Sequence, residues 1–239
     1  MKSLVTKYPL LFGFILFFAA MVAAIPVMLV LNLAGLPSDA AGAVGRIVVG
    51  LALLLALRSL ITWDKSLSGL GLAIPVLVIV AWNVVYHLMS GSEPIVASAI
   101  PGAILLGLAP GVFEESIFRG ATIGAMREAG KGPWYTLVAS SALCAVVHLT
   151  NAVGMDLPSV LVQVLYSLVV GLLLGAIYLR SGDIVTPILA HAAIDISNQV
   201  FAAHPTTTSV PMLAAFVVVL VAECAYALWL ARGRAQDGE

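Results

Sequence analysis

Apolar residues occur in eight long runs along this chain, and this pattern restricts its fold more than any other feature. A run of about 20 apolar residues is long enough to cross the hydrocarbon layer of a bilayer as an α-helix. Hydrophobic residues make up 62% of the 239 positions, far above the roughly 45–50% of a soluble domain. The pattern therefore predicts an all-α fold, a polytopic membrane bundle of about eight transmembrane helices. The runs cover approximately residues 10–33, 43–61, 71–90, 95–126, 134–152, 158–179, 184–202 and 210–231.

The first run follows a basic start, so a cleaved signal peptide is the alternative to a retained helix. This run has 24 residues, whereas the apolar region of a signal peptide has about 7–15. We therefore predict a retained first span. No repeat, low-complexity region or soluble segment separates the runs, and residues 1–239 are predicted to form a single integral membrane domain.

The distribution of basic residues predicts the orientation, because Lys and Arg accumulate on the cytoplasmic side of membrane proteins. With eight spans, Arg46 lies alone near one membrane face and Arg119 lies inside a span. Both termini are therefore predicted to be cytoplasmic. The other face carries the remaining nine basic residues, which are Lys2, Lys7, Arg58, Lys65, Arg127, Lys131, Arg180, Arg232 and Arg234.

Three charged residues lie inside the fourth run, in the segment GVFEESIFRG. Each charge at the middle of a bilayer costs about 2.5–3.5 kcal/mol even on a lenient insertion scale. Glu115 and Arg119 are four residues apart, so they share a helix face and are expected to pair. Glu114 points about 100° away and has no local counter-ion, which suits a general acid or base. We expect Glu115 and Arg119 to brace the site and Glu114 to be its reactive group.

Two later helices carry further polar residues. His191 and Asp195 are also four apart, and Asn198 continues the same face, while His148 lies on another helix. Such residues usually face a bundle interior or a water-filled cavity. One interpretation is a cluster of hydrogen bonds that only joins helices, and the other is the active site of an intramembrane hydrolase. His87 and Glu223 have no comparable partner and are not assigned to the site.

These motifs resemble the CAAX protease and bacteriocin-processing (CPBP) family of intramembrane endopeptidases. That family carries EExxxR, then FxxxH, then HxxxN or HxxxD, on successive helices of an eight-helix bundle. Here EExxxR spans residues 114–119 and HxxxD spans residues 191–195, while Cys144 replaces the frequent Phe before His148. This departure affects the packing beside the histidine. The resemblance covers residues 95–202, the expected catalytic core region.

The resemblance implies that the chain hydrolyses a peptide bond of a membrane-associated protein or peptide. It implies that Glu114 and His148 activate water, and that His191 and Asp195 stabilise the oxyanion. Members of the family are often called metalloproteases, so the alternative is a Zn²⁺ ion bound by His148, His191 and Glu114. Two histidines and a carboxylate with an open fourth position suit catalytic zinc. The HExxH and GxSxG motifs of other proteases are absent, and the sequence leaves metal-free and metal-dependent mechanisms open.

Two other functions compete with the protease. A catalytically silent membrane scaffold or immunity protein of the same family would keep the fold without cleaving. A proton-coupled transporter would use the same acids and histidines as a relay, but it predicts two related halves with broken helices, and no such symmetry is visible. The expected partners are the lipid bilayer and a membrane-associated protein or peptide substrate, not nucleic acid. The expected location is the plasma membrane of a prokaryote.

Overall fold

The computed structural model describes residues 2–64, 68–202 and 209–236, and the regular structure of these residues is entirely helical, without a β-strand. The predicted all-α class is confirmed. In chain order the elements are α1 (Lys2–Lys7), α2 (Pro9–Leu33), α3 (Ser38–Ala56), η1 (Ser68–Ala73), α4 (Val76–Met89), η2 (Ala97–Ala99), α5 (Ile100–Glu115), η3 (Ser116–Thr122), α6 (Ile123–Glu128), α7 (Pro133–Val147), η4 (His148–Val153), α8 (Leu157–Ser181), α9 (Val185–Gln199) and α10 (Val210–Gln236).

Each predicted run contains a helix, but the helices differ in length from the prediction. Within the described residues, six helical segments are long and apolar enough to cross a membrane, and two are shorter. α4 has 14 residues and α9 has 15, so at about 1.5 Å per residue neither reaches across a hydrocarbon layer of about 30 Å. α4 begins late because η1 and Pro75 precede it. The six spans are Pro9–Leu33, Ser38–Ala56, Ala97–Glu128, Pro133–Val153, Leu157–Ser181 and Val210–Arg232.

The fourth span is one continuous helical segment whose middle part, η3, is π-helical. The hydroxyl of Thr122 donates a hydrogen bond of 2.8 Å to the carbonyl of Ile117, five residues earlier. The hydroxyl of Ser116 donates to the carbonyl of Gly50 in α3, at 3.1 Å. Apolar periodicity did not reveal this widened turn. Short π-helical segments are frequent at functional sites, and this one follows directly after Glu115.

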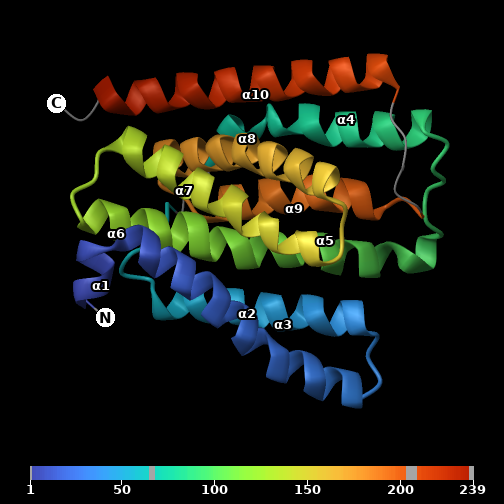
Figure 1. Cartoon of the computed structure of the whole chain (residues 1–239), viewed down its shortest axis with the longest axis horizontal. Helices are drawn as coiled ribbons and strands as arrows, with labels where there is room; N and C mark the ends of the chain where they lie inside the picture. The colour runs from blue at the N-terminus through green and yellow to red at the C-terminus, as the bar shows by residue number, and fades with distance from the viewer. Residues whose placement is uncertain (1, 65–67, 203–208, 237–239) are drawn as a thin grey trace.

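The long helices lie roughly alongside one another, with α5, α7, α8 and α9 in the middle of the bundle (Figure 1). α2 and α3 form a pair on one side, and α4 and α10 lie on the opposite side. α5 packs extensively on both α9 and α3, and α8 packs on α7 and α10. The central helices are those that carry the three predicted motifs.

Close contact between α5 and α9 depends on two glycines of α5. A Cβ atom added to Gly107 would lie 2.5 Å from the backbone nitrogen of Ile196, and one added to Gly111 would lie 2.8 Å from the carbonyl oxygen of Ile188. Small residues let membrane helices approach closely. This approach brings the middle of α9 next to the end of α5.

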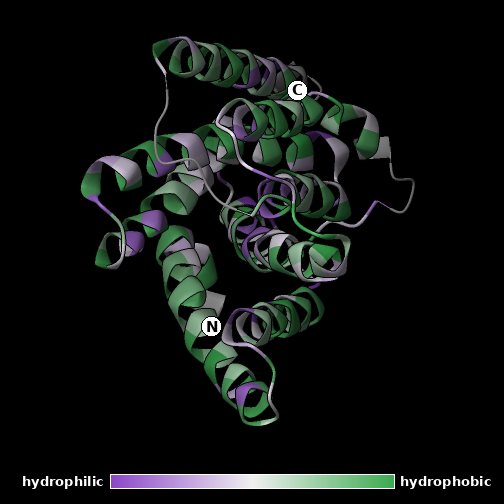
Figure 2. Ribbon diagram, turned by 90° about the vertical axis from the view of Figure 1, so that its right-hand side faces the viewer, coloured by the Kyte–Doolittle hydropathy of each residue, from purple (hydrophilic) through white to green (hydrophobic). Residues whose placement is uncertain are grey.

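The outer surface of the bundle is apolar, and its polar groups lie inside. In Figure 2 the outer helices are mostly hydrophobic, while hydrophilic segments gather near the centre of the bundle. Large apolar side chains such as Val22, Leu165 and Val221 are exposed, whereas Glu115 and Arg119 are buried. A polar interior under an apolar surface is the arrangement expected in lipid. The chain is an integral membrane protein.

Both termini and the connection between α6 and α7 lie at the same end of the bundle (Figure 1). The C-terminal ends of α3, α8 and α10 lie at this end of the bundle as well. These are the chain segments to which the sequence assigned the cluster of basic residues, although Lys65 lies outside the described residues. Arg46, which the sequence assigned to the opposite face, lies inside α3.

Candidate active site

The end of α5 and the start of η3 supply the three charges of the EExxxR motif, and their environments differ. The side chain of Glu115 is completely buried, with 0% exposure, whereas Glu114 keeps 16%. Consecutive side chains on a helix point about 100° apart. Glu115 therefore faces the packed interior, while Glu114 lines a cavity.

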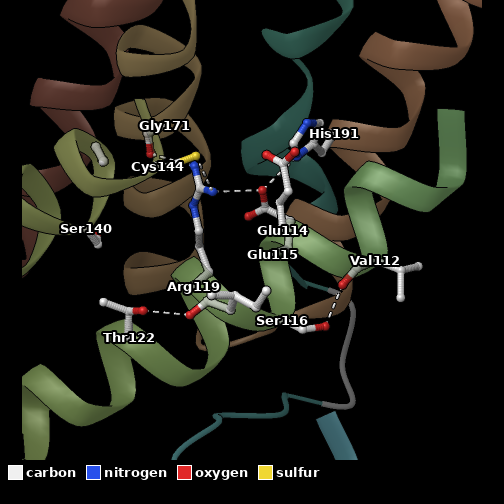
Figure 3. Close-up of polar contacts among 12 residues, drawn as sticks. Val112, Glu114, Glu115, Ser116, Arg119, Thr122, Ser140, Cys144, Gly171 and His191 are labelled. Carbon is white, nitrogen blue, oxygen red and sulfur yellow. Dashed lines mark hydrogen bonds and ion pairs between the residues drawn. The ribbon is translucent and has the colours of Figure 1, made fainter. Parts of the chain in front are cut away.

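Arg119 connects three elements of the site (Figure 3). One of its nitrogens, Nη1, donates a hydrogen bond of 2.9 Å to Oε1 of Glu115, so the expected ion pair is present. The other, Nη2, donates to the carbonyl of Gly171 in α8 at 3.1 Å. Nη1 also lies 3.7 Å from the sulfur of Cys144 in α7. The charge of Arg119 is thus fully engaged inside the bundle.

His191 is held mainly by Glu115. Its Nδ1 lies 2.8 Å from Oε1 of Glu115, and we assign the proton to Nδ1 because a carboxylate can only accept. Its Nε2 lies 3.6 Å from Oδ2 of Asp195. Asp195 is the neighbour that the spacing of four residues suggested, but the shorter contact is made by Glu115. The reason is the close packing of α5 on α9, which sequence spacing alone does not reveal.

Glu114 and His148 face each other from different helices. Oε2 of Glu114 lies 3.9 Å from Nε2 of His148, and the two side chains are 16% and 18% exposed. This distance is too long for a direct hydrogen bond but suits two groups that hold one water between them. His148 reaches this position because it begins η4, directly after the end of α7.

A cavity of about 330 Å³ lies among α2, α3, α5, α7, η4, α8 and α9. Five predicted site residues line it, and Glu115 lies behind them in the packed interior. The structure therefore brings together Glu114, Arg119, His148, His191 and Asp195.

The cavity also includes polar residues that the sequence analysis missed. Arg46 of α3 lines it, as do Tyr166 and Ser167 of α8. The side-chain nitrogen of Asn151 donates a hydrogen bond of 2.8 Å to the side-chain oxygen of Gln163, and both residues line the cavity. The position of Arg46 inside an apolar run was a usable signal. Tyr166 and Ser167 of α8 could not be recognised from the sequence, because nothing distinguishes them from other weakly polar residues in an apolar run.

Other intramembrane polar residues lie apart from this cavity. Asn198 was expected on the face of His191, but its Oδ1 lies 3.3 Å from Nε2 of His87 in α4. His87 therefore has a partner that the sequence did not suggest. Asn83 donates a hydrogen bond of 2.9 Å to Ser197. These contacts join α4 to α9 and so help to position the helix that carries His191.

The donor groups around the cavity form a candidate metal centre that differs from the predicted one. One ligand atom from each of Glu114, Cys144 and His148 lies within 4.8 Å of the others. All three residue types bind zinc, and three protein ligands with an open position suit a catalytic ion. His191 is not part of this group. The group Glu114, Cys144 and His148 fits a Zn²⁺ ion better than the predicted His148, His191 and Glu114.

The fold and the cavity together define a polytopic membrane protein with a polar cavity inside its helix bundle. Residues 96–197 match the family model described as "Rce1-like: Type II CAAX prenyl endopeptidase Rce1-like". This segment nearly coincides with the expected core 95–202, and the match supports the resemblance to the CAAX protease family of intramembrane endopeptidases. The search of curated proteins found no match.

Proposed function

We propose that this protein hydrolyses a peptide bond of a membrane-associated protein or peptide, with Glu114 and His148 activating water. The observation that carries the proposal is the convergence of Glu114, His148, His191 and Asp195 on one cavity inside an apolar bundle. Peptide hydrolysis in a membrane needs such an enclosed polar space, because water must reach the scissile bond there.

In the first step, Glu114 accepts a proton from water, and the hydroxide attacks the carbonyl carbon of the scissile bond. The 3.9 Å between Oε2 of Glu114 and Nε2 of His148 lets both groups hold that water. When the carbon–nitrogen bond breaks, Glu114 returns the proton to the leaving nitrogen. A positioned acid–base group of this kind contributes about 10²–10⁴-fold to a rate.

In the same step, the carbonyl oxygen becomes an oxyanion that needs hydrogen-bond donors. His191 provides its Nε2–H as an imidazolium, whose other proton, on Nδ1, is donated to Glu115. Asp195 lies 3.6 Å from that Nε2 and donates in its carboxylic acid form. A neutral carboxylic acid in an apolar site can serve as an oxyanion donor. Both donors come from α9, and Glu115 fixes their position.

The metal-dependent version remains the competing mechanism. A Zn²⁺ ion bound by Glu114, Cys144 and His148 would polarise the substrate carbonyl and make a bound water more acidic. Glu114 would then be a ligand rather than the base. Arg119 opposes this arrangement, since its Nη1 lies only 3.7 Å from the Cys144 sulfur and repels a cation there. We therefore favour the metal-free mechanism.

The experiment that tests the function is a comparison of peptides from membranes that contain the wild-type protein or Glu114→Gln. Glu114→Gln keeps the size of the side chain and removes its ability to accept a proton. We expect processed peptides with the wild type and none with the variant, at equal amounts of inserted protein.

The matched control is Glu128→Gln, because Glu128 is an exposed glutamate of α6 in the same helical segment. It should leave processing unchanged. Identical peptides with wild type and Glu114→Gln would contradict hydrolysis and leave the catalytically silent scaffold as the function. We also propose that both termini are cytoplasmic.

A further inference from the structure

Arg46 occupies a position that the bundle itself does not explain. It lies eight residues after the start of α3, about 12 Å along the helix axis, and thus deep in the span. It is half-buried and lines the same cavity as Glu114 and Asp195. An intramembrane arginine is costly and usually faces a partner or a substrate pathway.

Among the described residues, no hydrogen bond or ion pair involves Arg46. Its charge acts on Asp195 only at longer range. Arg119, the other arginine of the cavity, is fully engaged with Glu115, Cys144 and Gly171. Arg46 is therefore the arginine of this cavity that remains available to a ligand.

The ligand that suits Arg46 is an anion with two oxygens. The guanidinium group presents a planar fork of N–H donors that matches a carboxylate and binds it through two parallel hydrogen bonds. Elsewhere in the cavity, the carboxylate of Glu114 repels an anion. A carboxylate on a bound peptide would thus be stabilised at Arg46 and directed away from the reacting groups.

We propose that Arg46 is a specificity-determining residue that binds a carboxylate of the peptide substrate. The inference rests on the proposed function, because it assigns the ligand of the same cavity. The carboxylate is either the free end of the peptide chain or an acidic side chain. In both cases its contact with Arg46 fixes which peptide bond lies against Glu114.

The size of the cavity supports a short bound segment. A volume of about 330 Å³ is near the lower limit of ligand sites, which occupy about 300–1,000 Å³. Arg46 on α3 and Glu114 on α5 belong to helices that pack directly on each other. An anchor on α3 therefore defines the distance between the carboxylate and the cleaved bond.

The test measures binding to Glu114→Gln, which is not expected to cleave the ligand. The probes are fluorescent hexapeptides of leucine and alanine in three forms: with a free C-terminal carboxylate, with a C-terminal amide, and amidated with one internal glutamate. We expect the free acid or the glutamate peptide to bind about tenfold or more tightly than the neutral amide. The form that gains affinity identifies the source of the carboxylate.

Adding Arg46→Gln should abolish this preference, and adding Arg46→Lys should keep part of it. Arg127→Gln is the charge-matched control, since Arg127 is exposed in α6 and does not line the cavity. Unfolding temperatures in detergent exclude a folding defect, and Arg46→Lys carries the test if Arg46→Gln does not fold.

Equal binding of all three peptides, or no binding of any, overturns the inference. The same result follows if the preference persists without Arg46. These outcomes are independent of the proposed hydrolysis: peptides that bind through Arg46 but are never cleaved by the wild type contradict the hydrolase alone. Cleavage without any preference for a carboxylate contradicts Arg46 alone.

Discussion

Oε1 of Glu115 accepts hydrogen bonds from both Arg119, at 2.9 Å, and Nδ1 of His191, at 2.8 Å. A single carboxylate oxygen thus joins α5, η3 and α9 in the interior of the bundle (Figure 3). The charge of the buried arginine and the orientation of the histidine depend on the same group. Variants at these positions should show which contacts stabilise the fold and which support activity.

Arg119→Ala should destabilise the protein strongly. Removing one member of a buried ion pair leaves the other without compensation, which costs about 3–5 kcal/mol. Arg119 also donates to Gly171, so the contact between η3 and α8 is lost as well. Thermal unfolding in detergent measures the effect, with the exposed Arg127→Ala as control. An unfolding temperature equal to that of the wild type would show that the pair is not structural.

Asp195→Asn should retain most of the activity, and Asp195→Ala should lose it. In the proposed mechanism Asp195 acts as a hydrogen-bond donor, and the amide of asparagine also donates. Loss of one oxyanion donor costs about 10²–10³-fold in rate. The measurement is the rate of cleavage of a processed peptide found in the membrane comparison. Complete inactivity of Asp195→Asn would mean that the charged carboxylate is required.

Gly107→Ala should reduce both stability and activity. The new Cβ would lie 2.5 Å from the backbone nitrogen of Ile196, so α5 and α9 must separate. Their separation moves His191 away from Glu115, and small misplacements in a site can reduce a rate about 10²-fold.

The matched control is Gly102→Ala in the same helix, because a Cβ at Gly102 would meet no side chain or neighbouring helix of the described residues within 4 Å. This change should be neutral or stabilising, since alanine is the better helix former. Unfolding temperatures and cleavage rates check both variants. Identical effects of the two substitutions would show that the close contact between α5 and α9 does not matter.

Removal of metal should leave cleavage unchanged if Glu114 is the base. Purified protein is treated with a chelator, and its zinc content and cleavage rate are measured together. Loss of activity that zinc restores would favour the metal centre. In that case Cys144→Ala should lower the zinc content and His191→Ala should not, because only Cys144 belongs to the group with Glu114 and His148.

A cysteine at position 131 should react only with a reagent applied from the cytoplasmic side. Lys131 is exposed in the connection between α6 and α7, at the end of the bundle where both termini lie. The background lacks Cys144 and Cys224, the two cysteines of the chain. Labelling from the outside alone would reverse the predicted orientation.

The local part of the site could be predicted from sequence. The pairs Glu115–Arg119 and His191–Asp195 are each four residues apart, and helix geometry places such residues on one face whatever surrounds them. Their observed separations are 2.9 Å and 3.6 Å. Residues that lie on different helices have no such local constraint. The contact of His191 with Glu115 joins positions 76 residues apart, and it exists because Gly107 and Gly111 let α9 approach α5.

The sequence by itself determined an all-helical membrane protein. Its apolar runs are as long as a helix that crosses a bilayer, and they are too apolar for a soluble domain. It also determined which charges needed an explanation, since lipid tolerates few of them. Tertiary structure decided which charges meet. Arg46 was expected near a membrane face, but helix packing places it in the lining of the cavity. Packing also places Cys144 beside Arg119. These contacts depend on how closely two helices approach and on how each helix is rotated about its axis. The hydropathy of the sequence contains neither kind of information.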